Sequence, residues 1–134
     1  MSDRARLFCL TAIAGIMVSV GASAHHSFAV FFDDAHSVVT LRGMVTGFEF
    51  RNPHGLIRLT VRDPSGAETE WKVETNSPSI LERRGWTRDS LKSGESIAVE
   101  GWPARDGSKH MRMRKVTRAD GTPVGVPFDE PEVK

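Results

Sequence analysis

The chain has 134 residues, with 18 Lys and Arg, 17 Asp and Glu, five His and one Cys. This length is typical of one domain, and the near balance of charge excludes an acidic tail protein and gives no global reason to expect nucleic-acid binding. Because 39% of the residues are hydrophobic and 26% are charged, the composition is that of a globular protein rather than a disordered one.

The first 24 residues have the three parts of a secretory signal peptide. Arg4 and Arg6 precede an uncharged run over residues 7–20, and the next four residues end in an Ala-x-Ala sequence. The run is too short to span a bilayer comfortably, and a buried N-terminal helix is the weaker alternative because no polar residues alternate with the apolar ones. The sequence therefore predicts a Sec-type signal peptide over residues 1–24, a periplasmic location and no membrane span after cleavage.

Cleavage after Ala24 changes what chemistry is available. It would remove Cys9, the single cysteine, together with two Arg and one Asp, so that the mature chain is neutral by formal count. A disulfide framework, a thiolate metal site and a cysteine nucleophile are then excluded. The remaining chain is long enough to bury one modest core without cross-links.

The mature chain begins with an arm and continues with a bent strand. Residues 25–37 form the arm, which is rich in Phe, and the strand pattern begins at residue 38. The alternation of apolar residues changes phase near Gly43 and Gly47, which indicates a bent or bulged strand.

The rest of the chain predicts four more strands and one short helix. Alternation predicts strands over residues 56–62 and 68–75, joined by a Pro- and Gly-containing turn. Ser77 is predicted to cap a short helix that starts with Pro78 and stops at Gly85. Two further strands follow, and a Pro-containing tail over residues 120–134 is expected to be extended. The last two strands are predicted over residues 96–102 and 108–117.

This order of elements predicts a mainly β protein. Three strands, a helix and two strands are the element order of a small five-stranded OB-like Greek-key barrel, with one short helix between strands three and four. The barrel domain is predicted over residues 38–119. A partly open β-roll with the same order is the alternative.

Five short motifs carry a resemblance to a known family. They are AHHSF at residues 24–28, NPH at 52–54, SP at 77–78, RGWTRDSLKSG at 84–94 and GWPARDGS at 101–108. Together they resemble domain-of-unknown-function family 6152, which comprises small secreted bacterial proteins. The resemblance covers about residues 24–120. It implies periplasmic residence and a compact β domain, and it implies no established activity.

The mature N-terminus is the leading candidate metal site. Cleavage after Ala24 makes His25 the first residue, and its α-amine and ring Nδ1 can chelate one metal ion. His26 and His54, the latter in the loop between the first two strands, supply further imidazoles, and nitrogen ligands of this kind favour Cu(II). Cleavage after Ala22 would place His25 third, where it can bind Cu(II) with the terminal amine and the intervening amides. The alternative is a tolerated polar terminus, with His54 as a turn residue.

A second candidate metal site contains soft thioether ligands. His110, Met111 and Met113 lie together in the last predicted strand, and methionine sulfur selects Cu(I). The family pattern does not support this group, because small or polar residues are expected there in relatives. Met111 and Met113 also share one strand parity, so core packing is the preferred interpretation.

Arginines near the helix form a candidate anion site. Arg84 and Arg88, together with Arg83, surround Trp86 and could clamp an anion. Positive charge is equally favourable at the end of a helix, so a structural role is the alternative.

The last strand also carries a basic face. Its exposed parity holds Arg112 and Arg114, and a basic strand on an OB fold suggests single-stranded nucleic acid. A location outside the cytoplasm and the lack of stacking aromatics on that strand oppose this. We expect instead a solvated face that pairs with the acidic residues Glu68, Glu70 and Glu74.

The functional expectation is a non-enzymatic periplasmic binding module, because the sequence has no recognisable catalytic constellation. The leading hypothesis is a transition-metal ligand, with copper as the preferred metal, bound by His25, His26 and His54. The alternative is an accessory domain that docks a periplasmic protein partner through the rim loops of the barrel. A copper-dependent oxidation at the same terminus is a third hypothesis, for which the sequence offers no substrate cleft.

Overall fold

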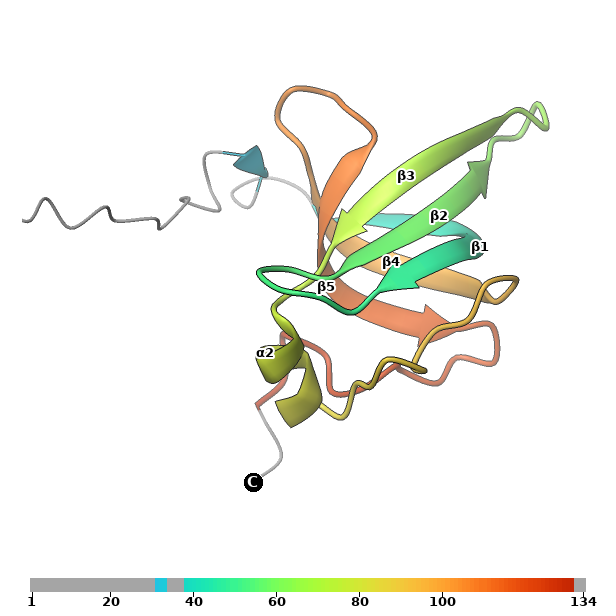
Figure 1. Ribbon diagram of the computed structural model, residues 1–134. Coiled ribbons are helices and arrows are strands. Elements are labelled where there is room, and N and C mark those ends of the chain that lie inside the picture. The colour runs from blue at the N-terminus through green and yellow to red at the C-terminus, as the bar shows by residue number, and fades with distance from the viewer. Residues whose placement is uncertain (1–30, 34–37, 132–134) are drawn as a thin grey trace, which may run out of the picture.

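A closed barrel of five strands dominates the computed structural model, which describes residues 31–33 and 38–131 (Figure 1). Around the barrel the strands follow the order β1-β2-β3-β5-β4, and β4 pairs with β1 to close it. This is the arrangement of an OB fold. It confirms the predicted fold class and excludes the open β-roll. The elements are β1 (Val39–Glu49), β2 (Leu56–Arg62), β3 (Glu68–Glu74), α2 (Pro78–Arg83), β4 (Ser96–Pro103) and β5 (His110–Arg118).

A short parallel pairing of β3 with β5 completes the ring. The strands β1, β2 and β3 form the predicted antiparallel meander, and β4 is antiparallel to both β1 and β5. In the parallel pair, Lys72 lies opposite His110 and Glu74 lies opposite Arg112. The acidic end of β3 is therefore placed against the basic start of β5.

The first strand, β1, pairs with two neighbouring strands because it bends. Its first half pairs with β4 and its second half pairs with β2. A shift of register between Val45 and Gly47 marks a bulge, whereas Gly43 lies where β2 approaches closely, since a Cβ there would be 2.4 Å from the Thr60 carbonyl oxygen. The predicted bent strand is confirmed, and its two glycines have different roles.

Alternate residues of the strands fill the barrel. Ile57 and Leu59 of β2, Val99 of β4, and Met111 and Met113 of β5 are buried in one core cluster. Burial of these side chains removes apolar surface from water and is the main stabilising contribution to such a fold. The core interpretation of the two methionines is thus confirmed.

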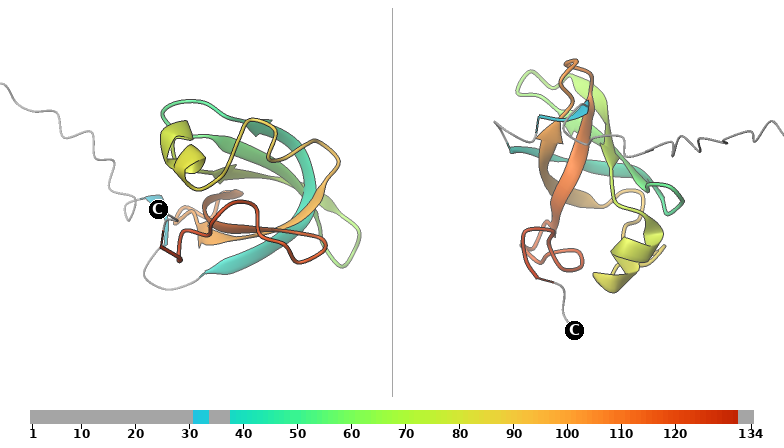
Figure 2. Two further views of the ribbon diagram at one scale, coloured as in Figure 1. Left: turned by 90° about the horizontal axis from the view of Figure 1, so that it is seen from below. Right: turned by 90° about the vertical axis from the view of Figure 1, so that its left-hand side faces the viewer.

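One end of the barrel is covered by α2 and by the chain that follows β5 (Figures 1 and 2). Leu81 of α2 and Val124 of the C-terminal segment both belong to the core cluster. The Val124 N–H donates to the Val116 carbonyl at 2.9 Å, and the Val126 N–H donates to the Arg84 carbonyl at 2.8 Å. The described part of the C-terminal segment, residues 120–131, is therefore docked on the barrel, because Val124 completes the core.

The start of α2 differs from the prediction in one respect. Ser77 occupies the cap position and Pro78 is the first helical residue, but the Ser77 side chain makes no capping hydrogen bond. Its hydroxyl lies 3.1 Å from the Ser79 hydroxyl instead, so the predicted side-chain cap is wrong. Gly85, with φ of 80°, follows the helix as predicted, since glycine tolerates this backbone conformation.

Candidate functional site

A pocket of about 590 Å³ opens between the β1–β2 loop, the β4–β5 loop and residues 31–33 of the arm. OB folds bind ligands with these two loops, and the volume lies in the range of roughly 300–1,000 Å³ found for ligand pockets. The pocket is therefore the candidate functional site. Its lining includes Phe31, Phe32, His54, Glu74, Arg105, His110 and Arg112.

The β1–β2 loop holds His54 beside the end of β3. The Gly55 N–H donates to the Asn76 carbonyl at 3.2 Å, and the Gly55 carbonyl accepts from the Thr75 N–H at 2.9 Å. A Cβ at position 55 would lie 2.5 Å from Thr75 Oγ1, so this close approach requires glycine. The preceding residue, His54, is consequently placed next to Glu74.

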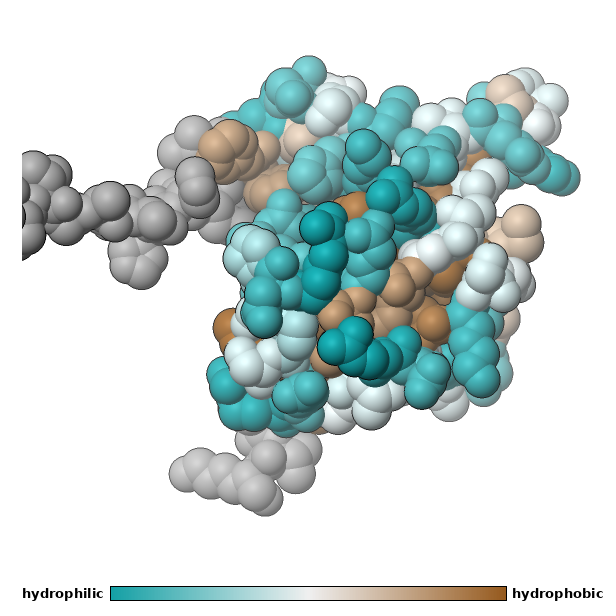
Figure 3. Space-filling model, viewed as in Figure 1, coloured by the Kyte–Doolittle hydropathy of each residue, from teal (hydrophilic) through white to brown (hydrophobic). Residues whose placement is uncertain are grey.

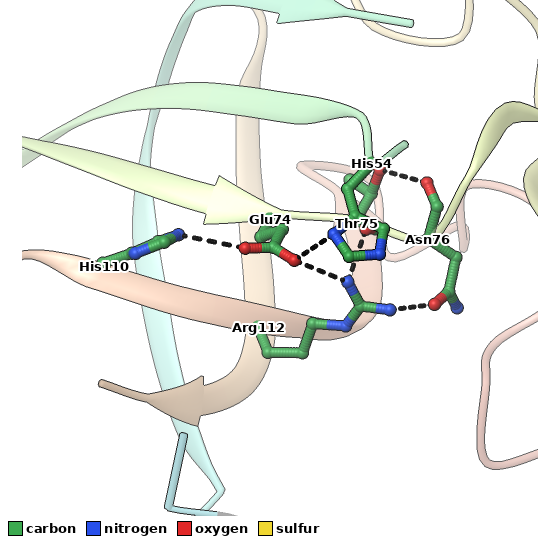
Figure 4. A network of polar contacts seen from close by, with 6 residues as sticks. All are labelled: His54, Glu74, Thr75, Asn76, His110 and Arg112. Carbon is green, nitrogen blue, oxygen red and sulfur yellow. Dashed lines mark hydrogen bonds and ion pairs between the residues drawn. The ribbon is translucent and has the colours of Figure 1, made fainter. Parts of the chain in front are cut away.

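Glu74 lies between two imidazole rings (Figure 4). His54 Nδ1 is 2.5 Å from Glu74 Oε1, and His110 Nε2 is 3.6 Å from Glu74 Oε2. An ionised carboxylate can only accept hydrogen bonds, so the tautomer of His54 that suits this contact has its proton on Nδ1. In the neutral ring, Nε2 then carries the lone pair that can bind a metal ion. The His54 side chain is 47% exposed.

Arg112 holds the same carboxylate from β5. Its Nη1 lies 3.2 Å from Glu74 Oε1 and 2.5 Å from the Thr75 carbonyl oxygen, and its Nη2 donates to Asn76 Oδ1. Only 12% of the Arg112 side chain is exposed. Burial lowers the pKa of Arg112, and the nearby charge of Glu74 opposes this effect. Arginine stays charged in proteins, so the pair gives Glu74 a fixed position.

Residues 31–33 of the arm are docked on the β4–β5 loop. The Asp33 N–H donates to the Pro103 carbonyl at 2.9 Å, and the Arg105 N–H donates to the Phe31 carbonyl at 3.0 Å. The Phe32 side chain is only 5% exposed. Its ring meets the His110 ring edge-on, with 5.2 Å between centroids. The arm is thereby part of the pocket wall.

The predicted metal ligands are only partly described. His54 lies in the pocket, whereas His25 and His26 are outside the described residues. Within residues 31–33 and 38–131, no group of three His, Cys, Asp or Glu side chains could hold a metal ion. A metal site at this pocket would therefore need at least one donor from another part of the chain.

The second candidate metal group is separated by the alternation of β5. His110 lines the pocket, while Met111 and Met113 are buried in the core. Alternate residues of a strand point to opposite faces. The structure thus does not bring the imidazole and the two thioethers together.

The predicted anion-binding arginines make structural contacts. Arg84 Nη1 donates to the carbonyls of Pro127 at 2.5 Å and Glu130 at 3.0 Å, and the guanidinium lies 4.4 Å from the centroid of the Phe128 ring. Arg88 Nη1 donates to the Phe50 carbonyl at 3.2 Å. Arg84 therefore anchors the C-terminal segment, and Arg88 contacts the end of β1.

The charged faces of the strands are paired, although some partners differ from those expected. Glu74 pairs with β5 as predicted, but Glu68 and Glu70 pair with Arg62 and Arg58 of β2. The outer surface of β2 and β3 is accordingly hydrophilic (Figure 3). On β5, Arg114 forms ion pairs with Glu100 at 3.5 Å and Asp129 at 2.9 Å.

Glu74, Arg112 and Phe32 are among the pocket residues that were not predicted as part of a site. Glu74 and Arg112 were assigned only to a solvated strand face, and Phe32 only to an aromatic arm. The parallel pairing of β3 with β5, which follows from the OB strand order, is the signal that places Glu74 beside Arg112 and His110.

Comparison with known proteins identifies the family to which the chain belongs. In the part of the chain that is described, no helix is long and apolar enough to cross a membrane. The chain has no significant match among curated proteins. Residues 14–113, which are well over half of the sequence, match the Family of unknown function (DUF6152). This agrees with the resemblance seen in the five short motifs. The protein therefore belongs to the DUF6152 family.

Proposed function

We propose that this protein is a periplasmic binding module that holds a transition-metal ion, preferably copper, at the pocket beside His54. The observation that carries the proposal is the 2.5 Å contact of His54 Nδ1 with Glu74 Oε1. Histidines that bind metals nearly always donate their other ring N–H to a carboxylate, a carbonyl or water, which fixes the tautomer and raises ligand basicity. His54 thus has the environment of a metal ligand, with Nε2 as the donor atom.

The remaining donors come from the mature N-terminus in this proposal. His25 precedes Phe31 by six residues, and an extended chain spans at most about 3.3–3.6 Å per residue, which gives a reach of roughly 20 Å. Because Phe31 lines the pocket, the α-amine and Nδ1 of His25 can reach the ring of His54. His26 supplies a further imidazole at the same terminus.

The donor set supports copper in its oxidised form. An α-amine and imidazoles are nitrogen ligands, and among divalent first-row ions such sites bind Cu(II) most tightly. Thioethers would favour Cu(I), but Met111 and Met113 are buried in the core. The proposed site therefore contains nitrogen ligands without methionine sulfur.

The alternative function, docking of a protein partner through the rim loops, has one observation in its favour. Phe31 is 54% exposed at the pocket, and exposed aromatic side chains are common at protein interfaces. The titration described next distinguishes metal binding from partner docking. If the pocket only docks a protein partner, the affinity for Cu(II) should not depend on His54.

The test is a calorimetric titration of the mature protein with Cu(II), after intact mass spectrometry has established its N-terminus. We expect one site with higher affinity than a synthetic peptide of residues 25–31, which has the same terminus but lacks the barrel. His54→Ala should lower the affinity to that of the peptide. Arg51→Ala, an exposed residue of the same loop, is the matched control and should leave it unchanged.

A second variant tests the terminal amine. A protein that retains a Met before His25 has its α-amine one residue farther away, and it should bind Cu(II) more weakly than the processed form. The proposal is contradicted if the mature protein binds no more tightly than the peptide, or if His54→Ala has no effect.

A further inference from the structure

We infer that the pocket binds a small, neutral aromatic molecule with a hydroxyl group, of the phenol class, through the carboxylate of Glu74 and the ring of Phe31. The metal ion proposed above is not required for this binding. Three features of the described pocket residues support the assignment: an apolar side, a hydrogen-bond acceptor on the opposite, polar side, and formal charges that cancel.

The apolar side of the pocket is formed by the arm and the β4–β5 loop, where Phe31, Phe32 and Ala104 line it. Phe31 is 54% exposed, whereas Phe32 is buried with its ring edge-on to that of His110. Two aromatic rings attract each other in offset-stacked or edge-on arrangements and bury a large apolar area. This side of the pocket therefore suits an aromatic ring, with Phe31 as the residue that it would cover.

The polar side of the pocket offers a hydrogen-bond acceptor on Glu74. Its Oε1 is already contacted by His54 Nδ1 and Arg112 Nη1. Among the described residues, Oε2 is paired only with His110 Nε2, at 3.6 Å, which is too long for a hydrogen bond. The two oxygens are distinguished in Figure 4. A ligand that covers Oε2 must supply an O–H or N–H donor, because a buried acceptor without a donor is costly.

The charges of the pocket favour a neutral ligand. Its lining contains two arginines, Arg105 and Arg112, and two acidic residues, Glu74 and Asp106. Both guanidinium groups already bind the protein, since Arg112 Nη1 donates to Glu74 and Arg105 Nε donates to the Phe32 carbonyl at 3.1 Å. An anion would have to displace these bonds beside two carboxylates, and a cation would lie near two guanidinium groups.

A sugar is also neutral and carries hydroxyl donors, but it matches this two-sided lining less well. Its hydroxyl groups surround the ring, so some of them would lie against Phe31, Phe32 and Ala104. These three residues have no polar side-chain atoms, and their carbonyl oxygens already accept hydrogen bonds within the protein. Burial of a hydroxyl group without a partner costs free energy, whereas a phenol has an apolar body and a single polar edge.

The test is a titration of the purified protein with phenol, followed by NMR, after treatment with EDTA to remove any metal ion. Anisole, in which a methyl group replaces the hydroxyl hydrogen, is the matched probe without a donor. We expect phenol to bind at least about tenfold more tightly than anisole, because a hydrogen bond to a charged group is one of the stronger kind. Benzoate, an anion, and glucose, a sugar, should both bind more weakly than phenol.

Glu74→Gln tests the acceptor on the polar side. Its neutral amide is a weaker acceptor than the carboxylate, so the preference for phenol over anisole should fall severalfold. Glu70→Gln, at an exposed position of the same strand, is the matched control and should keep the preference. A loss of pocket structure alone would weaken both probes equally, so an unchanged preference in Glu74→Gln would overturn the role of Glu74.

Phe31→Ala tests the apolar side and changes an exposed residue, so the fold should be retained. It should weaken phenol and anisole alike, about two- to tenfold, whereas Met44→Ala, an exposed apolar residue outside this pocket, should have no effect. Binding of this kind is overturned if phenol binds no more tightly than anisole, if benzoate or glucose binds more tightly than phenol, or if Phe31→Ala changes nothing. Because no metal ion is present, none of these outcomes decides the copper titration.

Discussion

Glu74 of β3 and Arg112 of β5 lie opposite each other in the parallel strand pair, with Arg112 Nη1 3.2 Å from Glu74 Oε1. This ion pair closes the barrel where β3 ends, and it also forms part of the pocket wall. Its carboxylate contacts His54 and His110 as well. The residues that join the strands are thus the residues that orient the candidate metal ligand.

Glu74→Gln tests whether the negative charge of Glu74 is needed to orient His54. The variant keeps a side chain of the same shape, but its neutral amide is a weaker acceptor than the carboxylate for the His54 N–H. We expect Cu(II) affinity to fall about 10- to 100-fold, as for other partners of metal ligands, measured by competition with a chelator. Glu70→Gln, an exposed position of the same strand, should have no effect. Equal affinities of the two variants would contradict the role of Glu74.

The contribution of Arg112 to stability should be large, since its guanidinium is mostly buried and donates to three different residues. Arg112→Met removes these bonds and leaves Glu74 without the guanidinium that faces it on β5. Loss of one partner of a buried ion pair typically costs about 3–5 kcal/mol, and because Glu74 is partly exposed we expect the lower end of that range. Urea unfolding measures the change.

Arg62→Met is the matched control for that measurement. Arg62 pairs with Glu68 on the exposed surface of the β2–β3 hairpin, and exposed ion pairs contribute about 1 kcal/mol or less. The free energy of unfolding should therefore change much less than in Arg112→Met. A similar loss in both variants would show that Arg112 is not a structural centre of the barrel.

Substitution by alanine should destabilise the protein at Gly43 but have little effect on its stability at Gly47. Gly43→Ala would place a Cβ 2.4 Å from the Thr60 carbonyl oxygen, and relief of such a clash shifts backbone at a typical cost of about 1–3 kcal/mol. At Gly47, the nearest atom to a Cβ is 3.6 Å away, on the flexible side chain of Arg58. We expect the free energy of unfolding of Gly47→Ala to lie within about 0.5 kcal/mol of the wild-type value. Thermal and urea unfolding of both variants test this difference.

Stability in acid should depend on Asp63 in the β2–β3 turn. Its Oδ1 accepts from Ser65 Oγ at 2.6 Å, Ser65 N at 2.8 Å and Ala67 N at 3.0 Å. These bonds, foremost that of the Ser65 hydroxyl, hold the pKa of Asp63 below its ordinary value of 3.8. A pKa that is lower in the folded state stabilises the fold fully above the ordinary value, and this stabilisation is lost as the pH falls through the lowered pKa.

We therefore expect the wild type to lose stability below about pH 4 more steeply than Asp63→Asn, which cannot titrate. Urea unfolding at several pH values measures the slope, and the carboxyl carbon resonance of Asp63 reports its titration directly. A titration midpoint at or above 3.8 would contradict the interpretation of the turn.

Local patterns were sufficient to predict most of the fold. The strand at residues 56–62 was predicted with the bounds that β2 has, because its alternation is regular and its ends carry Pro and Gly signals. The bent first strand was predicted from its change of phase. The Ser77 cap was predicted incorrectly, because the sequence does not reveal that the hydroxyl meets Ser79 instead.

Only the part of the candidate site that follows from a short local motif was predicted from the sequence. His54 follows from a short motif in a loop, so the sequence alone identifies it. The assembly of Glu74, His110 and Arg112 depends on pairing between strands that lie far apart in the chain, and the docking of Phe32 depends on a loop more than seventy residues away. No local periodicity contains this information.

The near-neutral composition, with one cysteine in 134 residues, and the alternation of apolar residues were sufficient to predict a globular β-barrel. The positions of the histidines in the sequence were sufficient to select those that should be tested as ligands. These properties follow from local chemistry and from the period of two residues that a half-buried strand requires. Only the tertiary structure decided which carboxylate holds His54, that the methionines of β5 are in the core, and that the arm forms a wall of the pocket. These relationships arise when the barrel closes, because closure brings β3, β5 and the arm together at one rim.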